Sequence, residues 1–378
     1  MHATTHARVA TGGRKQRDFR AASSASGPVR HYEYVFPDGA MYVYDIDHGF
    51  RLVRRVPLPG VNGVRGVAAS PRTRMLYVSY GAFGGPGTIG RLLAYNLVTG
   101  SVVYNRSYDF GVDNMAIDPA GRRIYMPDGE LSHDGVWNVI AAGSGNVIGK
   151  INGGLGPHET IVSLNGQHVY LSGVNTPWLE VASTATDRVI KRIGPLRAGV
   201  RPTTINGRET IAYTTASGYL GFQVSSITTG RVLFTLGFGP RFPAIVPTLT
   251  PSHGISLTPN ERQLWVMDSP NGYVHVFDVS GVPQRRPMRI ADIRLVHPLT
   301  GGSGWIQVGS NGCFVYVGDS GEVISTTSFE PVAFLPALRG TKESLEIDWR
   351  DGLPAATSTR TGLGHVTRGP DPPSAKCR

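Results

Sequence analysis

A strand–turn–strand unit recurs along this chain and constrains its fold more than any other feature. Each unit begins with a short apolar segment, and six of the seven segments are followed by a turn and a second alternating strand. The segments lie about 40 to 50 residues apart. They read VRGVAAS (64–70), VDNMAID (112–118), PHETIVS (157–163), VRPTTIN (200–206), SHGISLT (252–258), GSGWIQVG (302–309) and KESLEID (342–348).

Further alternating strands follow these pairs, such as WNVIAAGSGNVIGKI and VHVFDVSG. Four short strands in a repeat of this length are typical of a β-propeller blade. The units alternate with period two and show no helical stripe, which excludes a solenoid of helix pairs. The 49 glycines and 27 prolines supply the many turns that an all-β chain needs.

The two ends of the repeat region complete each other. KESLEIDWRDG near the C-terminus is not followed by a full set of strands, whereas HYEYVFPDGAMYVYDIDHGFRLVRRVPL near the N-terminus lacks a first strand. We therefore predict that the C-terminal strand completes the N-terminal blade and closes the ring, which removes exposed sheet edges. The predicted domain is an all-β, seven-bladed β-propeller over residues 31–360.

Three of the units resemble a known repeat. HGISLTPNERQLWVMDSPNGYVHVFDVS is similar to the YVTN repeat of YncE-type propellers, and DNMAIDPAGRRIYMPDG and HETIVSLNGQHVYLSG are similar to it as well. The resemblance implies a seven-bladed propeller like that of the quinoprotein amine dehydrogenase heavy chain. It does not fix a function, because this superfamily includes enzymes, binding proteins and scaffolds.

The repeat places one column of seven residues where the innermost strands begin, at the mouth of the central channel. Six of the seven are ionisable, in a chain with only 17% charged residues. Later positions in the same strands are mostly apolar and should pack between blades. We predict a polar ring that either binds a ligand or is a solvated ring of mutually neutralising charges. The column consists of Arg65, Asp113, His158, Arg201, His253, Ser303 and Glu343.

Two kinds of ligand suit this ring. A transition metal (Cu, Zn or Fe) could be held by His158 and His253 with the neighbouring Glu159, or with Asp113 or Glu343, as the oxygen ligand, because imidazole and carboxylate are ligands of these ions. A small anionic molecule could instead be clamped by Arg65 and Arg201, with the histidines as general acid and base. The ring fits a small acidic substrate better than a bare cation.

These alternatives define the candidate site residues. The candidate catalytic residues are His158, His253 and Arg201. The candidate ligand-binding residues are Arg65, Asp113, Asn114, Glu343 and Trp305. Two classes of function stay open: an enzyme of oxidoreductase, lyase or lactonase type, or a metalloprotein, that uses the ring, and a non-catalytic propeller scaffold that binds a protein partner.

Two loop segments give weaker indications of a functional site. The glycine-rich GAFGGPGTIG (81–90) joins two strands and opens no helix, so it is predicted to be a blade loop and not a phosphate cradle. PDGELSHDG (127–135) lies between second and third strands, on the face of the channel mouth. We interpret it as a solvated turn, with a lid over the mouth as the alternative.

The net charge of +10 belongs mostly to the two ends of the chain. Residues 1–30 supply +5 and residues 361–378 supply +2, and we predict both to be disordered tails. A specific nucleic-acid role is not expected, since it needs basic residues clustered on a folded face.

The cysteines and the apolar segments bear on the compartment in which the protein is found. Cys313 lies in an apolar run and Cys377 in a proline-rich tail with nothing to hold it in place, so we predict no disulfide between them. No signal peptide is evident and no apolar run approaches transmembrane length. The protein is expected to be soluble, with export and the cytoplasm both left open.

Overall fold

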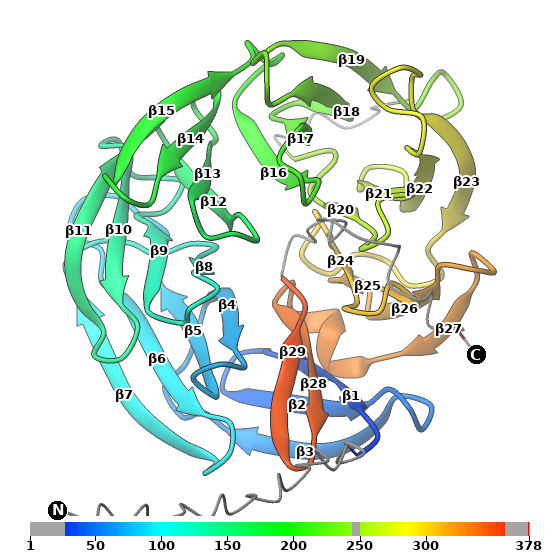
Figure 1. Cartoon of the computed structure of the whole chain (residues 1–378). Helices are drawn as coiled ribbons and strands as arrows, with labels where there is room; N and C mark the ends of the chain where they lie inside the picture. Colours follow the sequence, from blue (N-terminus) through cyan, green and yellow to red (C-terminus); the bar gives the residue numbers. More distant parts are fainter. Residues whose placement is uncertain (1–26, 244–249, 360–376, 378) are drawn as a thin grey trace, which may run out of the picture.

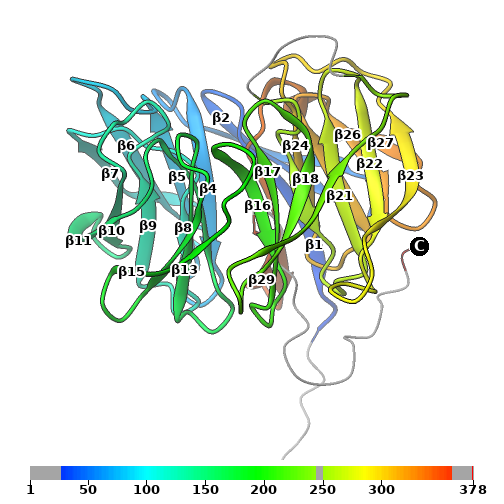
Figure 2. The same cartoon turned by 90° about the horizontal axis from the view of Figure 1, so that it is seen from above.

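The computed structural model describes residues 27–243, 250–359 and 377, and these form seven β-sheets arranged as a ring (Figure 1). Six sheets have four strands and one has five. The fold is therefore the predicted all-β, seven-bladed propeller. Figure 2 shows the ring from the side, with the strands running roughly along the axis of the ring.

In blades 2 to 7 the chain runs outwards, so that the first strand lies innermost and the fourth lies at the rim (Figure 1). Blade 2 consists of β4 (Val64–Ser70), β5 (Met75–Gly81), β6 (Gly90–Asn96) and β7 (Ser101–Tyr108). Blade 3 consists of β8 (Ala116–Ile117), β9 (Arg123–Pro127), β10 (Val136–Ala141) and β11 (Asn146–Asn152). Blade 4 consists of β12 (Pro157–Val162), β13 (His168–Gly173), β14 (Leu179–Ser183) and β15 (Arg188–Ile193).

The other three blades of this kind follow the same plan. Blade 5 consists of β16 (Val200–Ile205), β17 (Ile211–Ala216), β18 (Tyr219–Ser226) and β19 (Val232–Gly237). Blade 6 consists of β20 (Ile255–Leu257), β21 (Gln263–Asp268), β22 (Tyr273–Asp278) and β23 (Met288–Arg294). Blade 7 consists of β24 (Trp305–Val308), β25 (Phe314–Gly318), β26 (Glu322–Ser325) and β27 (Pro331–Phe334), and the 3-10 helix η1 (Pro336–Gly340) follows it.

Blade 1 is built from both ends of the described chain. Its strands are β1 (Arg30–Val35), β2 (Ala40–Asp45), β3 (Arg51–Pro57), β28 (Ser344–Arg350) and β29 (Leu353–Thr357). β28 pairs with β1 along six residues, from Arg30 opposite Trp349 to Val35 opposite Ser344. This confirms the predicted closure of the ring. The additional strand β29 was not predicted; it pairs with β28 on the channel side of the blade.

The core lies in the seams between neighbouring blades. Second and third strands are covered on both faces, so they are almost continuously buried, as in β5 and β10. Fourth strands lie at the rim and are mostly exposed, as in β7. One seam cluster joins Leu345 and Ile347 of β28 to Val67 and Val78 of blade 2. The strand that closes the ring therefore also contributes to the core.

One sequence prediction is wrong: Cys313 and Cys377 form a disulfide. Cys313 lies at the turn before β25. The prediction considered only non-covalent anchoring of the tail. A covalent bond needs no such anchor, because it fixes Cys377 to blade 7 by itself, 64 positions along the chain from Cys313. The two predicted tails otherwise lie outside the described residues, apart from residues 27–30. Within the part of the chain that is described, no helix is long and apolar enough to cross a bilayer.

Candidate binding site at the channel mouth

Two histidines from different blades meet over the channel. His158 lies in β12 of blade 4, and His253 lies just before β20 of blade 6. Their ring centroids are 5.6 Å apart although blade 5 separates their blades. Side chains of non-adjacent blades approach each other in this way over the channel and not inside a seam. Both are buried, with 6% and 7% of their surface exposed.

Each of these rings is oriented through its Nδ1 atom. His158 Nδ1 lies 3.0 Å from Asp113 Oδ2, and His253 Nδ1 lies 3.1 Å from the carbonyl oxygen of Gly304. Both partners are acceptors, so each Nδ1 carries a proton and donates it. In the neutral ring, Nε2 is then left with a lone pair. His158 Nε2 is buried and has no hydrogen-bond partner among the described residues.

A structural histidine of the same chain shows the difference. His275 is fully buried, and both of its ring nitrogens are bonded, Nδ1 to Asp292 at 2.7 Å and Nε2 to Asp268 at 3.1 Å. Buried polar atoms are normally satisfied in this manner. His158 therefore retains a hydrogen-bonding capacity that a purely structural role does not explain.

Arg201 of β16 is held beside the histidines by an acidic loop residue. Its Nη1 donates to Glu130 Oε2 at 2.7 Å, and its Nε donates to Ser217 Oγ at 3.0 Å. Burial acts to raise the pKa of Glu130, but His158 and Arg201 outweigh it and hold that pKa below its usual value. An ionised carboxylate thus lies among the basic groups of the mouth. The 127–135 segment is a solvated turn only in part: Leu131, His133 and Asp134 are exposed, whereas Asp128 is buried and Glu130 reaches Arg201.

The glycine-rich segment 81–90 explains how Glu130 reaches this position. Gly84 and Gly129 pack backbone to backbone across the two loops, where a Cβ atom on Gly84 would lie 2.6 Å from the Ser132 nitrogen. Leu131 N also donates to the Phe83 carbonyl at 3.1 Å. Both glycines have positive φ, so side chains are excluded there by space and by backbone conformation. The segment is a blade loop, as predicted, and it supports the 127–135 loop.

Lys342 is a basic residue of the mouth that the repeat did not reveal. Its Nζ lies 2.5 Å from Ser303 Oγ and 3.7 Å from Asp319 Oδ2. Burial, together with the charge of Lys342, sets the pKa of His253 well below its usual value. The His253 ring is therefore neutral at neutral pH. Lys342 lies one residue before Glu343 of the predicted column. The repeat aligns a single position of each blade, so Lys342 was not among the predicted residues.

The remaining predicted residues are placed as follows. The Arg65 guanidinium carbon lies 3.8 Å from the Phe83 ring centroid, so Arg65 stacks on the supporting loop. Trp305 is buried and meets the His253 ring edge-on, with centroids 5.2 Å apart. Glu343 is buried and lies directly before β28. Two acidic residues of the mouth pair with basic ones, Asp113 with His158 and Glu130 with Arg201.

Glu159 is not brought together with the two histidines. Its Oε2 accepts a hydrogen bond of 2.6 Å from the Thr203 backbone nitrogen in blade 5. The side chain therefore enters the seam between blades 4 and 5. The β12–β13 pairing is irregular between Pro157 and Glu159, and at such a break His158 is directed to the channel while Glu159 enters the seam. The metal-ligand set of His158, His253 and Glu159 is not assembled in the described structure.

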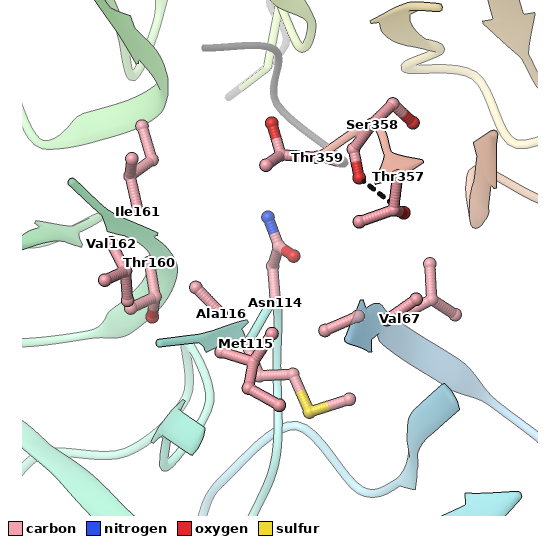
Figure 3. A pocket seen from close by; sticks show the side chains of 13 residues that line it. Val67, Asn114, Met115, Ala116, Thr160, Ile161, Val162, Thr357, Ser358 and Thr359 are labelled. Atoms are coloured by element: carbon pink, nitrogen blue, oxygen red, sulfur yellow. Dashed lines mark hydrogen bonds between the residues drawn. The ribbon is translucent and has the colours of Figure 1, made fainter. Parts of the chain in front are cut away.

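Asn114 faces a separate pocket further along the channel (Figure 3). This pocket has a volume of about 130 Å³ and is lined by β4, β8, β12 and the end of β29. Its walls are mostly apolar, with Thr160 and Ser358 among the polar exceptions. Asn114 is buried, and neither side-chain amide atom has a hydrogen-bond partner within the described residues. The pocket therefore offers one unsatisfied donor and one unsatisfied acceptor.

The electrostatics around His253 disfavour a metal ion at this ring. Lys342, His158 and Arg201 all act to lower the pKa of His253, which means that a positive charge on this ring is opposed by its neighbours. The same neighbours would oppose a metal cation at His253 Nε2. Conversely, the mouth already accommodates the carboxylate of Glu130.

The fold and this cluster define a seven-bladed β-propeller with buried polar groups at one end of its channel. A scan against known protein families found no match for the chain, and a search of curated proteins found none either. The resemblance to YVTN-type propellers thus rests on the repeat pattern alone.

Proposed function

We propose that this propeller binds a small hydroxylated carboxylate at its channel mouth, with Arg201 as the anchor of the carboxylate group. The observation that carries the proposal is the Arg201–Glu130 ion pair, because it shows a carboxylate bound in this position by a buried guanidinium. Guanidinium groups bind carboxylates in a directed, charge-assisted manner. The repeat pattern supports a propeller of the YVTN type.

The two histidines are the reason for proposing a hydroxyl group on the ligand. His253 is neutral and its Nδ1 donates to Gly304, so its Nε2 accepts hydrogen bonds. His158 Nε2 is the unpartnered acceptor beside it. A ligand that fits both features carries a negative group for Arg201 and an O–H donor for the histidines.

The same arrangement defines the chemistry that this site would perform. Asp113 orients His158 through Nδ1, which is how a carboxylate orients a general base. His158 would then accept the proton of the ligand hydroxyl, and Arg201 would hold the carboxylate while the proton moves. His158, His253 and Arg201 are the proposed catalytic residues.

Matched ligands and variants test this proposal. Thermal unfolding of the full chain is measured with acetate and glycolate, and with succinate and malate, which differ by one hydroxyl in each pair. We expect the hydroxylated member to stabilise the protein more. The Arg201→Gln variant should lose the response to both members, whereas the His158→Ala/His253→Ala double variant should lose only the preference for the hydroxyl.

His48 is the matched control, because it is an exposed histidine paired with a single carboxylate in blade 1. His48→Ala should respond to the ligands as the unmodified protein does. The proposal is abandoned if no member of either pair stabilises the protein, or if Arg201→Gln responds normally. A protein-binding scaffold would then be the better interpretation, although the exposed apolar residues of the outer strands are distributed over all seven blades and mark no single face.

A further inference from the structure

The ladder that closes the ring carries a second group of ionisable residues. His31 lies directly opposite Asp348, and Glu33 lies directly opposite Glu346. Opposed residues share a face of the sheet, as do residues two apart on one strand. The four side chains therefore project to the same side of the β1–β28 pair.

Three of them come within the reach of one ion. His31 Nδ1 lies 2.7 Å from Asp348 Oδ1 and 3.5 Å from Glu346 Oε1. One donor atom from each of the three lies within 4.8 Å of the other two, and no other group of this kind is found in the described part of the chain. A tetrahedral ion with bonds of about 2 Å places its ligand atoms roughly 3.4 Å apart. The donors are thus already close to ligand spacing.

The surroundings of this cluster are acidic, in contrast to the channel mouth. No lysine or arginine forms an ion pair with Glu33, Glu346 or Asp348 among the described residues. His31 is the one basic side chain that the described residues place against these carboxylates, through its contacts with Asp348 and Glu346. A gathering of carboxylates with so little positive charge beside it favours a cation.

Two further groups are left without partners beside the cluster. Glu33 is fully buried, and its Oε2 has no hydrogen-bond partner within the described residues. The Tyr316 hydroxyl of blade 7 is likewise buried without a partner, and it lies in the field of Glu346 and Glu33. Unsatisfied buried groups are costly, and an ion or its bound water would satisfy them.

We propose that His31, Glu346 and Asp348 bind one Zn²⁺ ion that joins the first and last parts of the chain. The imidazole donor selects a first-row transition ion over Ca²⁺ or Mg²⁺, which take oxygen ligands. Ser310 Oγ lies 2.8 Å from Glu346 Oε1 and 2.9 Å from Asp348 Oδ2, between which its single proton is shared, and Ser310 N donates to Glu346 Oε2 at 3.0 Å, so Ser310 helps to orient the carboxylates. The His31 side chain is 24% exposed, which gives the ion a path from solvent.

Zinc would replace the proton that His31 Nδ1 shares with the two carboxylates. Binding would tie β1 to β28 at the closure of the ring, so it would stabilise the folded protein. This consequence separates a metal site from the alternative, in which the protonated imidazole alone serves as the cation of the cluster.

The test uses the full chain, without an affinity tag and treated with EDTA. ZnCl₂ is titrated by calorimetry at neutral pH, and the melting temperature is measured with and without the ion. We expect one equivalent to bind, with proton release and a rise of several degrees in melting temperature. His31→Gln and Asp348→Asn should each weaken binding by about tenfold or more.

His48→Gln is the matched control, since His48 Nδ1 lies 2.9 Å from Asp45 Oδ2 in the same blade but meets only that one carboxylate. It should bind zinc as the unmodified chain does. Asp348→Asn keeps an oxygen that can accept from His31, so it remains informative if His31→Gln disturbs the closure. The proposal is overturned if zinc neither binds nor raises the melting temperature, or if both site variants bind it normally. It is also overturned if the His158→Ala/His253→Ala variant is the one that loses zinc.

Discussion

Glu130 Oε2 accepts a hydrogen bond from Arg201 Nη1 at 2.7 Å, although the two residues belong to blades 3 and 5. The contact spans blade 4 and passes beside His158, which in its protonated form would also lower the pKa of Glu130. The channel mouth therefore contains a carboxylate of its own, delivered by a loop. An incoming anion has to compete with it for Arg201.

Removal of that competitor should strengthen ligand binding. In the Glu130→Gln variant, the side chain can still accept a hydrogen bond from Arg201 but no longer carries the charge. A hydrogen bond to a charged group is worth about 1.5–3 kcal/mol, so we expect the affinity for glycolate or malate to rise by about tenfold or more. Calorimetric titration of both proteins measures the change.

Glu330 supplies the control for this experiment, because it is an exposed glutamate in the turn between β26 and β27. Glu330→Gln should leave the affinity unchanged. If Glu130→Gln binds the same anions more weakly than the unmodified protein, Glu130 is a ligand-binding residue and not a competitor.

The extent to which the sequence predicts this site follows from the symmetry of the fold. His158, Arg201 and His253 occupy equivalent positions of the repeat, so a propeller brings them to one channel mouth wherever the blades begin. Glu130 and Lys342 lie outside that column, in a loop and before a strand, and a loop's path depends on packing that no period reports. Glu159 was misplaced because the pairing of β12 is irregular between Pro157 and Glu159, and the repeat pattern does not report such a local break.

The acidic loop that carries Glu130 should make stability depend on pH. Burial, aided by Asp134, raises the pKa of Asp128 from 3.8 to about 7. The folded protein then holds a proton that the unfolded chain releases, so this contribution to stability is complete below about pH 4 and is lost as pH rises through 7. Asp128→Asn removes the ionisation and retains an oxygen for Asn138, which donates to it.

Thermal unfolding between pH 5 and pH 8 checks this. The melting temperature of the unmodified protein should fall over this range relative to that of Asp128→Asn, and the two should be most alike at the acid end. Asp109→Asn changes an exposed aspartate, so its melting temperature should depend on pH as that of the unmodified protein does. If the melting temperatures of Asp128→Asn and the unmodified protein differed by the same amount at every pH, Asp128 would be ionised throughout the range.

The closure of the ring can be tested by truncation. A chain that ends after residue 340 lacks β28 and β29, so β1 loses its partner along six residues. Leu345 and Ile347 are also lost from the seam with blade 2. We expect loss of the cooperative unfolding transition by heat or urea. A chain that ends after residue 359 retains both strands and should unfold cooperatively. Cooperative unfolding of the shorter chain at an unchanged temperature would contradict this account of ring closure.

The disulfide between Cys313 and Cys377 leads to the last prediction. Protein purified without reductant should contain no free thiol, and peptide mapping should recover the two cysteines in one linked species. A cross-link between residues 64 positions apart restricts the unfolded chain, and natural disulfides contribute about 2–4 kcal/mol to stability. Reductant should therefore lower the free energy of unfolding of the unmodified protein and leave that of Cys377→Ser unchanged. Cys313 is buried, so its thiol in that variant should react slowly until the protein unfolds. Two rapidly reacting thiols in the untreated protein would show that the tail is not linked to blade 7.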